Sequence, residues 1–180
     1  MRISFLSLAF VLAAAVCCQG AVAVKHDNTG GSSSDSYVGR QVVPFTAVAV
    51  SGAELSSTDH GGTVLIISLW GINCASCLDE MKALESIYGE FKGQGLKIWA
   101  VNTEDIDAGE IVKNLQSREI VVSYDLIPDP GLVITKAFTN WFIPVTVIVD
   151  SEGIVQYHKA GFNETEAQQI KAKVGALLAR

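Results

Sequence analysis

The sequence is short of positive charge and of cysteine, and both shortages narrow what the protein can do. Its 180 residues contain 13 Lys and Arg against 19 Asp and Glu, which gives a formal net charge of −6 at pH 7. Nucleic-acid binding depends on basic residues that neutralise phosphates, so an acidic chain without a basic cluster is a poor candidate for it. The sequence also has no glycine-rich phosphate-binding loop and no visible internal repeat. We therefore expect no nucleic-acid partner and no nucleotide site of that kind.

The first residues have the pattern of a secretory signal peptide. Arg2 provides a positive start, residues 5–16 are an apolar segment, and residues 21–23 form a cleavage site of small residues. We expect a signal peptide over residues 1–23 and a periplasmic or secreted mature protein that begins at Val24. An uncleaved membrane anchor is the alternative, but the apolar run is shorter than the roughly 20 residues that a span needs.

Only four cysteines occur, and two of them lie in the predicted leader. Cys17 and Cys18 follow its apolar segment, which leaves open a lipid-anchored or membrane-tethered form, although a lipidated cysteine normally follows a small residue. Removal of the leader leaves Cys74 and Cys77. An oxidising compartment permits structural disulfides, but these two have no other cysteine to pair with. The mature protein therefore carries a single Cys-x-x-Cys motif.

The rest of the chain has the composition of a globular domain, since 49% of the whole sequence is hydrophobic and 18% is charged. Residues 24–41, rich in Gly, Ser, Asp and Asn, predict a flexible tether, and residues 42–180 form the expected domain. Apolar runs predict strands at 46–50, 63–69, 96–101, 121–124, 145–150 and 154–158, with a polar connection over 55–62. Helical spacing of apolar residues predicts helices over 78–91, 111–118 and 132–138, and a closing helix capped by Asn163.

This order of strands and helices predicts an α/β fold. After an N-terminal β segment the order is β-α-β-α-β-α-β-β-α, and alternating strands and helices indicate a largely parallel sheet covered on both faces. The last two strands are expected to form an antiparallel hairpin around residues 151–153.

The two cysteines stand where a buried strand meets an amphipathic helix. The apolar residues 64–69 precede them, and the helical spacing begins at Leu78. The first N–H groups of a helix lack partners and the helix dipole is positive there, so a thiolate is stabilised. Such sites lower a thiol pKa from about 8.5 to roughly 3.5–7.5. We expect Cys74, nearest the helix start, to be the exposed nucleophile, and Cys77 to attack it from one turn further in.

Three segments in this order resemble the extracytoplasmic TlpA/ResA/DsbE-like group of thioredoxin-fold proteins. Residues 69–77 resemble that group's Phe-Trp-Ala-x-x-Cys-x-x-Cys, and residues 142–155 its Gly-Ile-Pro-Thr-Thr-Phe-Leu-Ile-Asp-x-x-Gly-x-Ile-Val. Residues 43–52 resemble its N-terminal hairpin entry. The resemblance covers about residues 42–180 and implies a thioredoxin-like fold. That fold has a central mixed sheet with helices on both faces, an N-terminal β extension and a central βα insertion over residues 102–138.

The resemblance also implies roles for residues around the cysteines. Glu80 stands where this group has an acid that is proposed to exchange protons with the active-site thiols. The simpler alternative is that its negative charge stabilises the start of the helix by interacting with the helix dipole. Pro144 is expected to be a cis-proline facing the cysteines, with the Ile143 backbone free to pair with a partner strand; an ordinary turn proline is the alternative. Trp70, expected to pack beside the active-site loop, and Asn73, at its rim, complete the predicted substrate-binding residues.

The sequence departs from the group at several positions. Asn73 replaces the usual tryptophan before the first cysteine, Ala75-Ser76 replaces a proline-containing dipeptide, and Val145 replaces a threonine. Ser68 occupies the strand position at which thioredoxin has a buried aspartate. These departures leave open which surface is offered to a partner.

No metal or other cofactor is expected. The histidines at positions 26, 60 and 158 are scattered, and neither a His-x-x-His motif nor a second Cys-x-x-Cys accompanies the cysteines. Asn163-Glu164-Thr165 fits a glycosylation sequon, but it serves equally as a helix cap.

By resemblance, the protein is expected to be a monomeric thiol–disulfide oxidoreductase. It would reduce specific protein disulfides, for example in cytochrome c maturation, and would be re-reduced by a membrane electron donor of the CcdA/DsbD-like kind. Two alternatives stay open: a thiol peroxidase of the AhpC/TSA-like kind, and a redox-inert binding domain. The sequence does not contain the single cysteine with a threonine three residues before it that a thiol peroxidase is expected to have. The presence of both motif cysteines argues against the redox-inert domain. Whether the protein reduces or oxidises its partners depends on its redox potential.

Overall fold

The computed structural model describes residues 37–139 and 142–180. The predicted signal peptide, the two leader cysteines and most of the predicted tether lie outside these residues. Within the described part of the chain, none of the helices combines the length and the apolar character needed to cross a membrane.

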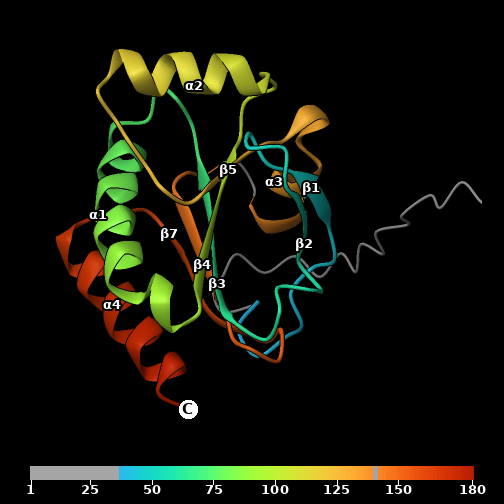
Figure 1. Cartoon of the computed structure of the whole chain (residues 1–180), viewed down its shortest axis with the longest axis vertical. Helices are drawn as coiled ribbons and strands as arrows, with labels where there is room; N and C mark the ends of the chain where they lie inside the picture. The colour runs from blue at the N-terminus through green and yellow to red at the C-terminus, as the bar shows by residue number, and fades with distance from the viewer. Residues whose placement is uncertain (1–36, 140–141) are drawn as a thin grey trace, which may run out of the picture. The chain divides into compact units, whose positions relative to one another are not determined.

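A five-stranded mixed sheet forms the centre of the fold (Figure 1). Its spatial order is β5 (Asp125–Pro128), β4 (Leu96–Asn102), β3 (Val64–Trp70), β6 (Val145–Val149) and β7 (Val155–Ala160). β3 pairs in parallel with β4, and β4 with β5, whereas β6 pairs antiparallel with both β3 and β7. The predicted hairpin thus joins the central sheet through β3, which makes the sheet mixed and not largely parallel.

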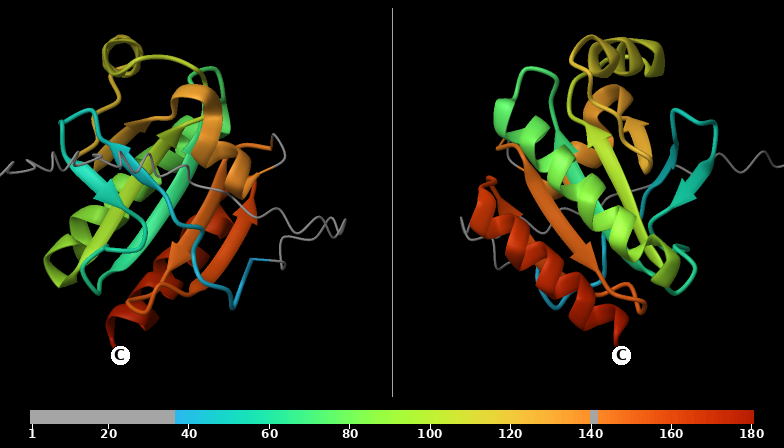
Figure 2. Two further views of the ribbon diagram at one scale, coloured as in Figure 1. Left: turned by 90° about the vertical axis from the view of Figure 1, so that its right-hand side faces the viewer. Right: turned by 60° about the vertical axis from the view of Figure 1, so that its left-hand side comes forward.

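Helices cover both faces of this sheet (Figure 2). On one face, α1 (Ala75–Phe91) and α4 (Glu164–Leu178) lie side by side. Buried residues of α2 (Ala108–Ser117) join the same hydrophobic cluster as α1 and α4. The other face carries α3 (Val133–Phe138), which follows the short 3-10 helix η3 (Pro130–Leu132), and the two-stranded hairpin β1 (Thr46–Val48) and β2 (Glu54–Ser56). A second 3-10 helix, η2 (Lys92–Gln94), ends α1. This arrangement confirms the predicted central mixed sheet with helices on both faces.

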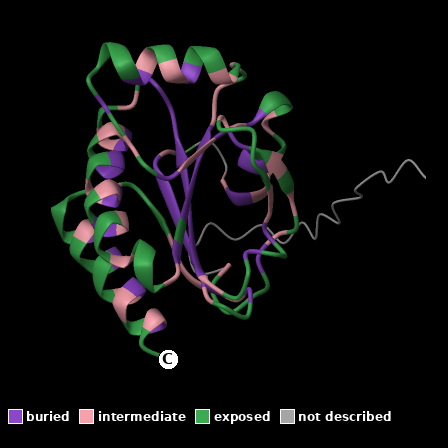
Figure 3. Cartoon of the chain, viewed as in Figure 1, coloured by how far each residue is buried: buried purple, intermediate pink, exposed green. Residues whose placement is uncertain are grey.

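The core consists of two hydrophobic clusters, one on each face of the sheet. The central strands are largely buried, whereas the helices α1 and α4 alternate buried and exposed residues (Figure 3). All seven residues of β3 are buried because it lies in the middle of the sheet. Its side chains alternate, so Ile66 and Trp70 pack under α1 and α4, and Ile67 and Leu69 pack on the α3 side. Ser68, on the α1 side of β3, is the one polar residue of the strand.

Two local predictions were wrong. The strand expected over 121–124 begins instead at Asp125, because only the residues from there on pair with β4. The residues before it are held by side chains: the Glu85 carboxylate accepts hydrogen bonds from the Ser123 N–H and hydroxyl groups, and the Tyr124 hydroxyl donates to the Met81 carbonyl. The expected polar connection over 55–62 contains most of β2, which pairs with β1 by main-chain hydrogen bonds that do not need an apolar sequence.

Ordered contacts begin before the predicted domain start at Val42. The Gly39 N–H donates to the Val155 carbonyl, and the Val155 N–H donates to the Arg40 carbonyl, both at 2.8 Å. The Tyr37 ring stacks on the His158 ring at a centroid distance of 4.4 Å. The segment from Tyr37 to Gln41, assigned to the tether from its composition, therefore lies against the start of β7.

Candidate active site

Cys74 and Cys77 form a disulfide at the start of α1, and their surroundings differ. Cys74 is the N-cap residue, and its sulfur accepts a hydrogen bond from the Cys77 N–H at an N···S distance of 3.2 Å. The side chain of Cys74 is partly exposed, whereas Cys77 is completely buried. Cys74 is therefore the cysteine that lies nearer to solvent, and Cys77 is closed off from it. In the reduced protein, the same N–H group and the helix dipole stabilise a Cys74 thiolate.

Glu80 lies on the buried side of α1, one turn beyond Cys77, and has no exposed surface. Its carboxylate accepts hydrogen bonds from the hydroxyl groups of Thr146 on β6 and Ser68 on β3. Burial raises the pKa of Glu80 to about 7, although both hydroxyl hydrogen bonds oppose this rise by stabilising the carboxylate. An acid with this pKa can gain or lose a proton near neutral pH. Ser68, which occupies the position of the buried aspartate of thioredoxin, thus donates a hydrogen bond to Glu80.

The Ile143–Pro144 peptide bond is cis, as the resemblance implied. The Ile143 side chain reaches the loop before the cysteines: a Cβ atom on Gly71 would lie 2.9 Å from its Cδ1 atom. The ladder between β3 and β6 ends at Leu69 and Val145, so the peptide groups of Ile143 lie beyond it. The Pro144 carbonyl accepts a hydrogen bond from the Gly161 N–H at 2.8 Å. Ile143 thus lies beside the active-site loop, and the neighbouring Pro144 is buried.

The other two predicted substrate-binding residues have different environments. Trp70 is completely buried, and its carbonyl accepts hydrogen bonds from the Thr103 N–H and hydroxyl groups at 2.8 and 3.2 Å. Its side chain packs in the core, as expected, and offers no surface to a partner in this state. Asn73 is exposed, and its Oδ1 atom accepts a hydrogen bond from Arg118 Nη2 at 3.4 Å. Because Arg118 is the C-cap of α2, that helix contributes to the rim of the site.

A residue that the sequence analysis missed holds the active-site loop. The Glu104 carboxylate accepts a hydrogen bond from the Ile72 N–H at 2.8 Å and lies 3.5 Å from Asn102 Nδ2. The Glu104 N–H in turn donates to Asn102 Oδ1 at 2.9 Å. The signal available in the sequence was position: in parallel sheets, functional groups gather beyond the carboxyl ends of neighbouring strands. Glu104 follows β4 closely, and the cysteines follow β3.

Within residues 37–139 and 142–180, no group of three or more His, Cys, Asp and Glu side chains is placed to hold a metal ion. His60 lies on the polar segment before β3. His158, on β7, stacks with Tyr37. Neither histidine forms a metal site with the two cysteines.

Comparisons with known proteins agree with this fold. The model of the AhpC/TSA family matches residues 38–158. The thiol-disulfide oxidoreductase ResA of Halalkalibacterium halodurans is 28% identical over 146 residues, which cover 81% of each chain. A solved structure from Bacteroides thetaiotaomicron superposes with a TM-score of 0.72 at 21% identity, covering 79% of this chain and 91% of that one. A structure from Chlorobium tepidum, assigned as a DsbE thiol:disulfide interchange protein, has a TM-score of 0.71 at 19% identity and covers 78% and 97%. These likenesses confirm the predicted thioredoxin-like fold and the predicted resemblance.

Proposed function

The chain belongs to the AhpC/TSA family, and we propose that it is an extracytoplasmic thiol–disulfide oxidoreductase that reduces specific protein disulfides. The observation that supports this proposal best is the unequal exposure of the Cys74–Cys77 disulfide at the start of α1. An accessible outer sulfur and a buried inner sulfur are what a two-step exchange needs, because only one of them should meet the partner.

The exchange transfers two electrons from the dithiol to the partner. The Cys74 thiolate attacks one sulfur of the partner disulfide, the partner's sulfur–sulfur bond breaks, and a mixed disulfide forms while the other partner sulfur leaves as a thiolate. Glu80 takes the proton of the Cys77 thiol. The Cys77 thiolate then attacks the Cys74 sulfur, the mixed disulfide breaks, and the second partner sulfur is released. The partner becomes a dithiol after taking up two protons, and this protein becomes the disulfide observed here.

The finer parts of the proposal concern the partners. Ile143 and Pro144 would pair with an extended segment of the substrate protein, and Asn73 would contact it from the rim. The disulfide must be reduced again after each turnover, which calls for an electron donor such as a membrane dithiol protein of the CcdA/DsbD-like kind. A haem-binding Cys-x-x-Cys-His disulfide of an apocytochrome c is one substrate of the required chemistry.

Reduction of insulin by dithiothreitol tests the central claim. The exported protein, predicted to begin at Val24, is expected to accelerate insulin precipitation, and the Cys74→Ser variant is expected to lose this acceleration. If the wild type and Cys74→Ser precipitate insulin at equal rates, the oxidoreductase function is refuted and the redox-inert binding domain is favoured. Measuring the redox potential and trapping partners with Cys77→Ser, which stops at the mixed disulfide, then decides the direction and the substrate.

The family assignment also favours a test of the peroxidase alternative. Gly71 stands three residues before Cys74, where the peroxidase pattern places threonine, and this glycine is closely approached by Ile143. We expect hydrogen peroxide to be consumed no faster by the wild-type dithiol than by free dithiothreitol. Rapid consumption that depends on Cys74 and not on Cys77 would favour the peroxidase over the disulfide reductase.

A further inference from the structure

The residue before Ile143 is a phenylalanine whose side chain faces solvent: Phe142 is 74% exposed. Residues 142–144 correspond to Gly-Ile-Pro in the pattern that they resemble, so the aromatic side chain is a feature of this chain and not of that pattern. Exposure alone says little, because single apolar side chains are common on protein surfaces. What distinguishes Phe142 is its place next to Ile143 and the way in which its backbone is held.

One side chain, that of Thr139, binds both main-chain polar groups of Phe142. Its Oγ1 atom donates a hydrogen bond to the Phe142 carbonyl at 2.9 Å and accepts one from the Phe142 N–H at 3.2 Å. Thr139 is itself the C-cap residue of α3, so this contact ties Phe142 to the end of a helix. A ring that extends from a fixed backbone loses less conformational freedom on binding than a ring on a mobile loop. Thr139 thus holds an exposed aromatic side chain in a set place.

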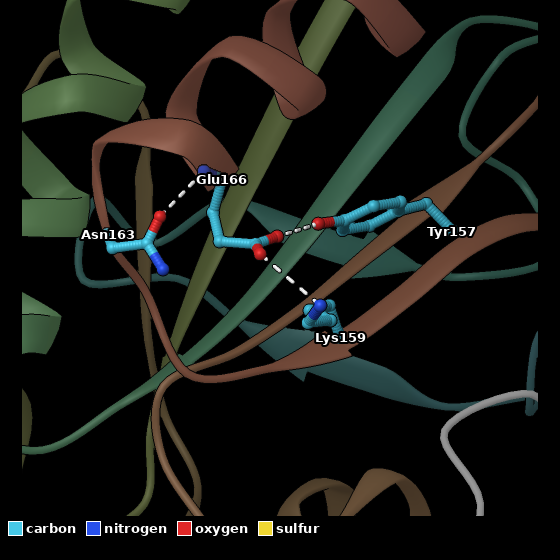
Figure 4. Close-up of polar contacts among 4 residues, drawn as sticks. All are labelled: Tyr157, Lys159, Asn163 and Glu166. Atoms are coloured by element: carbon cyan, nitrogen blue, oxygen red, sulfur yellow. Dashed lines mark hydrogen bonds and ion pairs between the residues drawn. The ribbon is translucent and has the colours of Figure 1, made fainter.

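The chain is also held on the other side of Ile143, at Pro144. The Pro144 carbonyl accepts its hydrogen bond from Gly161, which lies in the short connection between β7 and α4. Polar contacts fix this connection (Figure 4). Asn163 Oδ1 accepts a hydrogen bond from the Glu166 N–H at 3.1 Å, and the Tyr157 hydroxyl donates one to Glu166 Oε2 at 2.6 Å. Both neighbours of Ile143 are therefore anchored.

Ile143, between these anchors, has unused main-chain groups. Among the residues that the structure describes, neither its N–H nor its carbonyl group has a hydrogen-bond partner. The main-chain groups of Phe142 are taken by Thr139, and Pro144 has no N–H group and a bound carbonyl. The groups of residues 142–144 that are left for an extended partner segment are therefore those of Ile143, directly beside the Phe142 ring.

We propose that Phe142 is a specificity-determining residue that binds an apolar side chain of the partner next to its disulfide, and that Thr139 is the positioning residue that holds Phe142 there. The proposal rests on the proposed function, in which a substrate segment pairs with Ile143 and brings its disulfide to Cys74. Contact between the Phe142 ring and an apolar side chain of that segment removes the surface of both from water. The preferred substrates are thus polypeptides with a large aliphatic or aromatic residue next to the disulfide-bonded cysteine.

Two synthetic peptides of equal length test this preference. Each is closed by a Cys-Gly-Gly-Cys disulfide, which is flanked by leucine on both sides in one peptide and by serine in the other. The reduced wild-type protein should reduce the leucine peptide about fivefold faster, as followed by chromatography of acid-quenched samples. Phe142→Ala should bring the ratio of the two rates close to 1, and Phe142→Leu should keep most of it. A merely structural role of Phe142 would slow both peptides alike and leave the ratio at its wild-type value.

The same ratio tests the role of Thr139. Thr139→Val keeps the shape of the side chain but loses both hydrogen bonds to Phe142, and the ratio should fall to about twofold. Thr139→Ser keeps the hydroxyl group and should restore the wild-type ratio. The matched control is Val48→Ala, because Val48 is 57% exposed but lies on β1, whose hairpin contacts β5 at the far edge of the sheet from β7. An unchanged ratio in Phe142→Ala, or an equal fall in Val48→Ala, would overturn the proposal.

The experiment separates this proposal from the proposed function. A wild type that reduces both peptides at equal rates would refute the preference and keep the oxidoreductase function. A wild type that reduces neither would refute the function. Fluorescence anisotropy of a labelled leucine peptide with Cys74→Ser then tests the binding role alone, which holds if binding is lost when Phe142→Ala is added and fails if binding persists. Sedimentation of the wild type as a dimer that Phe142→Ala makes monomeric would assign the side chain to a contact between copies and overturn the proposal.

Discussion

Two carboxylates flank the cysteines, and their environments are opposite. Glu80 is fully buried and accepts hydrogen bonds from two neutral hydroxyl groups, so that burial raises its pKa to about 7. Glu104 is partly exposed and accepts a hydrogen bond from the Ile72 N–H group of the active-site loop. The same chemical group therefore stands in two different environments. For Glu80 the proposed role is to exchange a proton inside the protein, whereas Glu104 binds a backbone N–H group of the active-site loop.

The largest expected difference between the two acids is in how stability depends on pH. A raised folded pKa means that the native state binds the Glu80 proton more tightly than the unfolded state does. The resulting stability is fully present below the ordinary pKa of 4.5 and is lost as pH rises through about 7. In Glu80→Gln, the loss of unfolding free energy between pH 5 and pH 8 should shrink by about 3 kcal/mol.

Urea unfolding of the oxidised protein at the two pH values measures this difference. Glu104→Gln is the matched control, and its unfolding free energy should depend on pH between 5 and 8 as in the wild type. An unchanged slope in Glu80→Gln would show that this acid titrates alike in the folded and unfolded states, and the comparison between the two carboxylates would fail.

The next effect concerns thiol reactivity. In the reduced protein, Glu80→Gln should slow the alkylation of Cys77 at pH 7 by a factor of about 10–100, because a positioned base contributes on the order of that factor or more. The onset of reactivity should also move to higher pH. Iodoacetamide labelling over a pH series, with Cys74→Ser as background so that only Cys77 reacts, measures both. A wild-type pH profile in Glu80→Gln would exclude its role as proton acceptor.

A smaller effect is expected at Glu104. Glu104→Gln replaces a charged acceptor of the Ile72 N–H group by a neutral one, which should cost about 1 kcal/mol of unfolding free energy. The rate of insulin reduction should fall because the active-site loop is held less firmly, whereas the pH onset of Cys77 labelling should stay at its wild-type value. A displaced onset would mean that Glu104 also takes part in proton transfer.

The smallest effect should come from Gly71→Ala. The added Cβ atom would lie 2.9 Å from Ile143 Cδ1, which is the far end of a flexible side chain and moves at little cost. We expect insulin reduction to slow by about twofold and stability to change by less than about 1 kcal/mol. Kinetics with Ile143→Ala in the same background test the cause, because removing the Ile143 side chain should relieve the effect. A full loss of activity would show that loop position matters more than either carboxylate.

The predictions made from the sequence succeeded where neighbours in the chain decide the structure. Helical spacing after Cys77 and the run of apolar residues before Trp70 correctly placed α1 and β3. They failed where partners lie far along the chain. Residues 121–124 have β-branched and aromatic side chains, but their partners are Glu85 and Met81 on α1, so they form no strand.

Glu104 was missed for the same reason. Its position just after β4 was the only signal in the sequence, and acids are common in such turns. Its role arises only because β3 and β4 are parallel neighbours, which brings the Ile72 N–H to within 2.8 Å of its carboxylate. Glu80 was named by resemblance, but the hydroxyl groups that bind it are distant in sequence and could not be read from spacing.

The sequence by itself determined that two cysteines stand at a helix start behind a buried strand, because caps and apolar periodicity are local properties. The resemblance, in turn, implied the cis bond before Pro144 that the structure has. The tertiary structure alone decided which cysteine is buried and which hydroxyl groups bind Glu80. The Glu80 contacts depend on strand register, which brings together Ser68 and Thr146, two residues far apart in the chain.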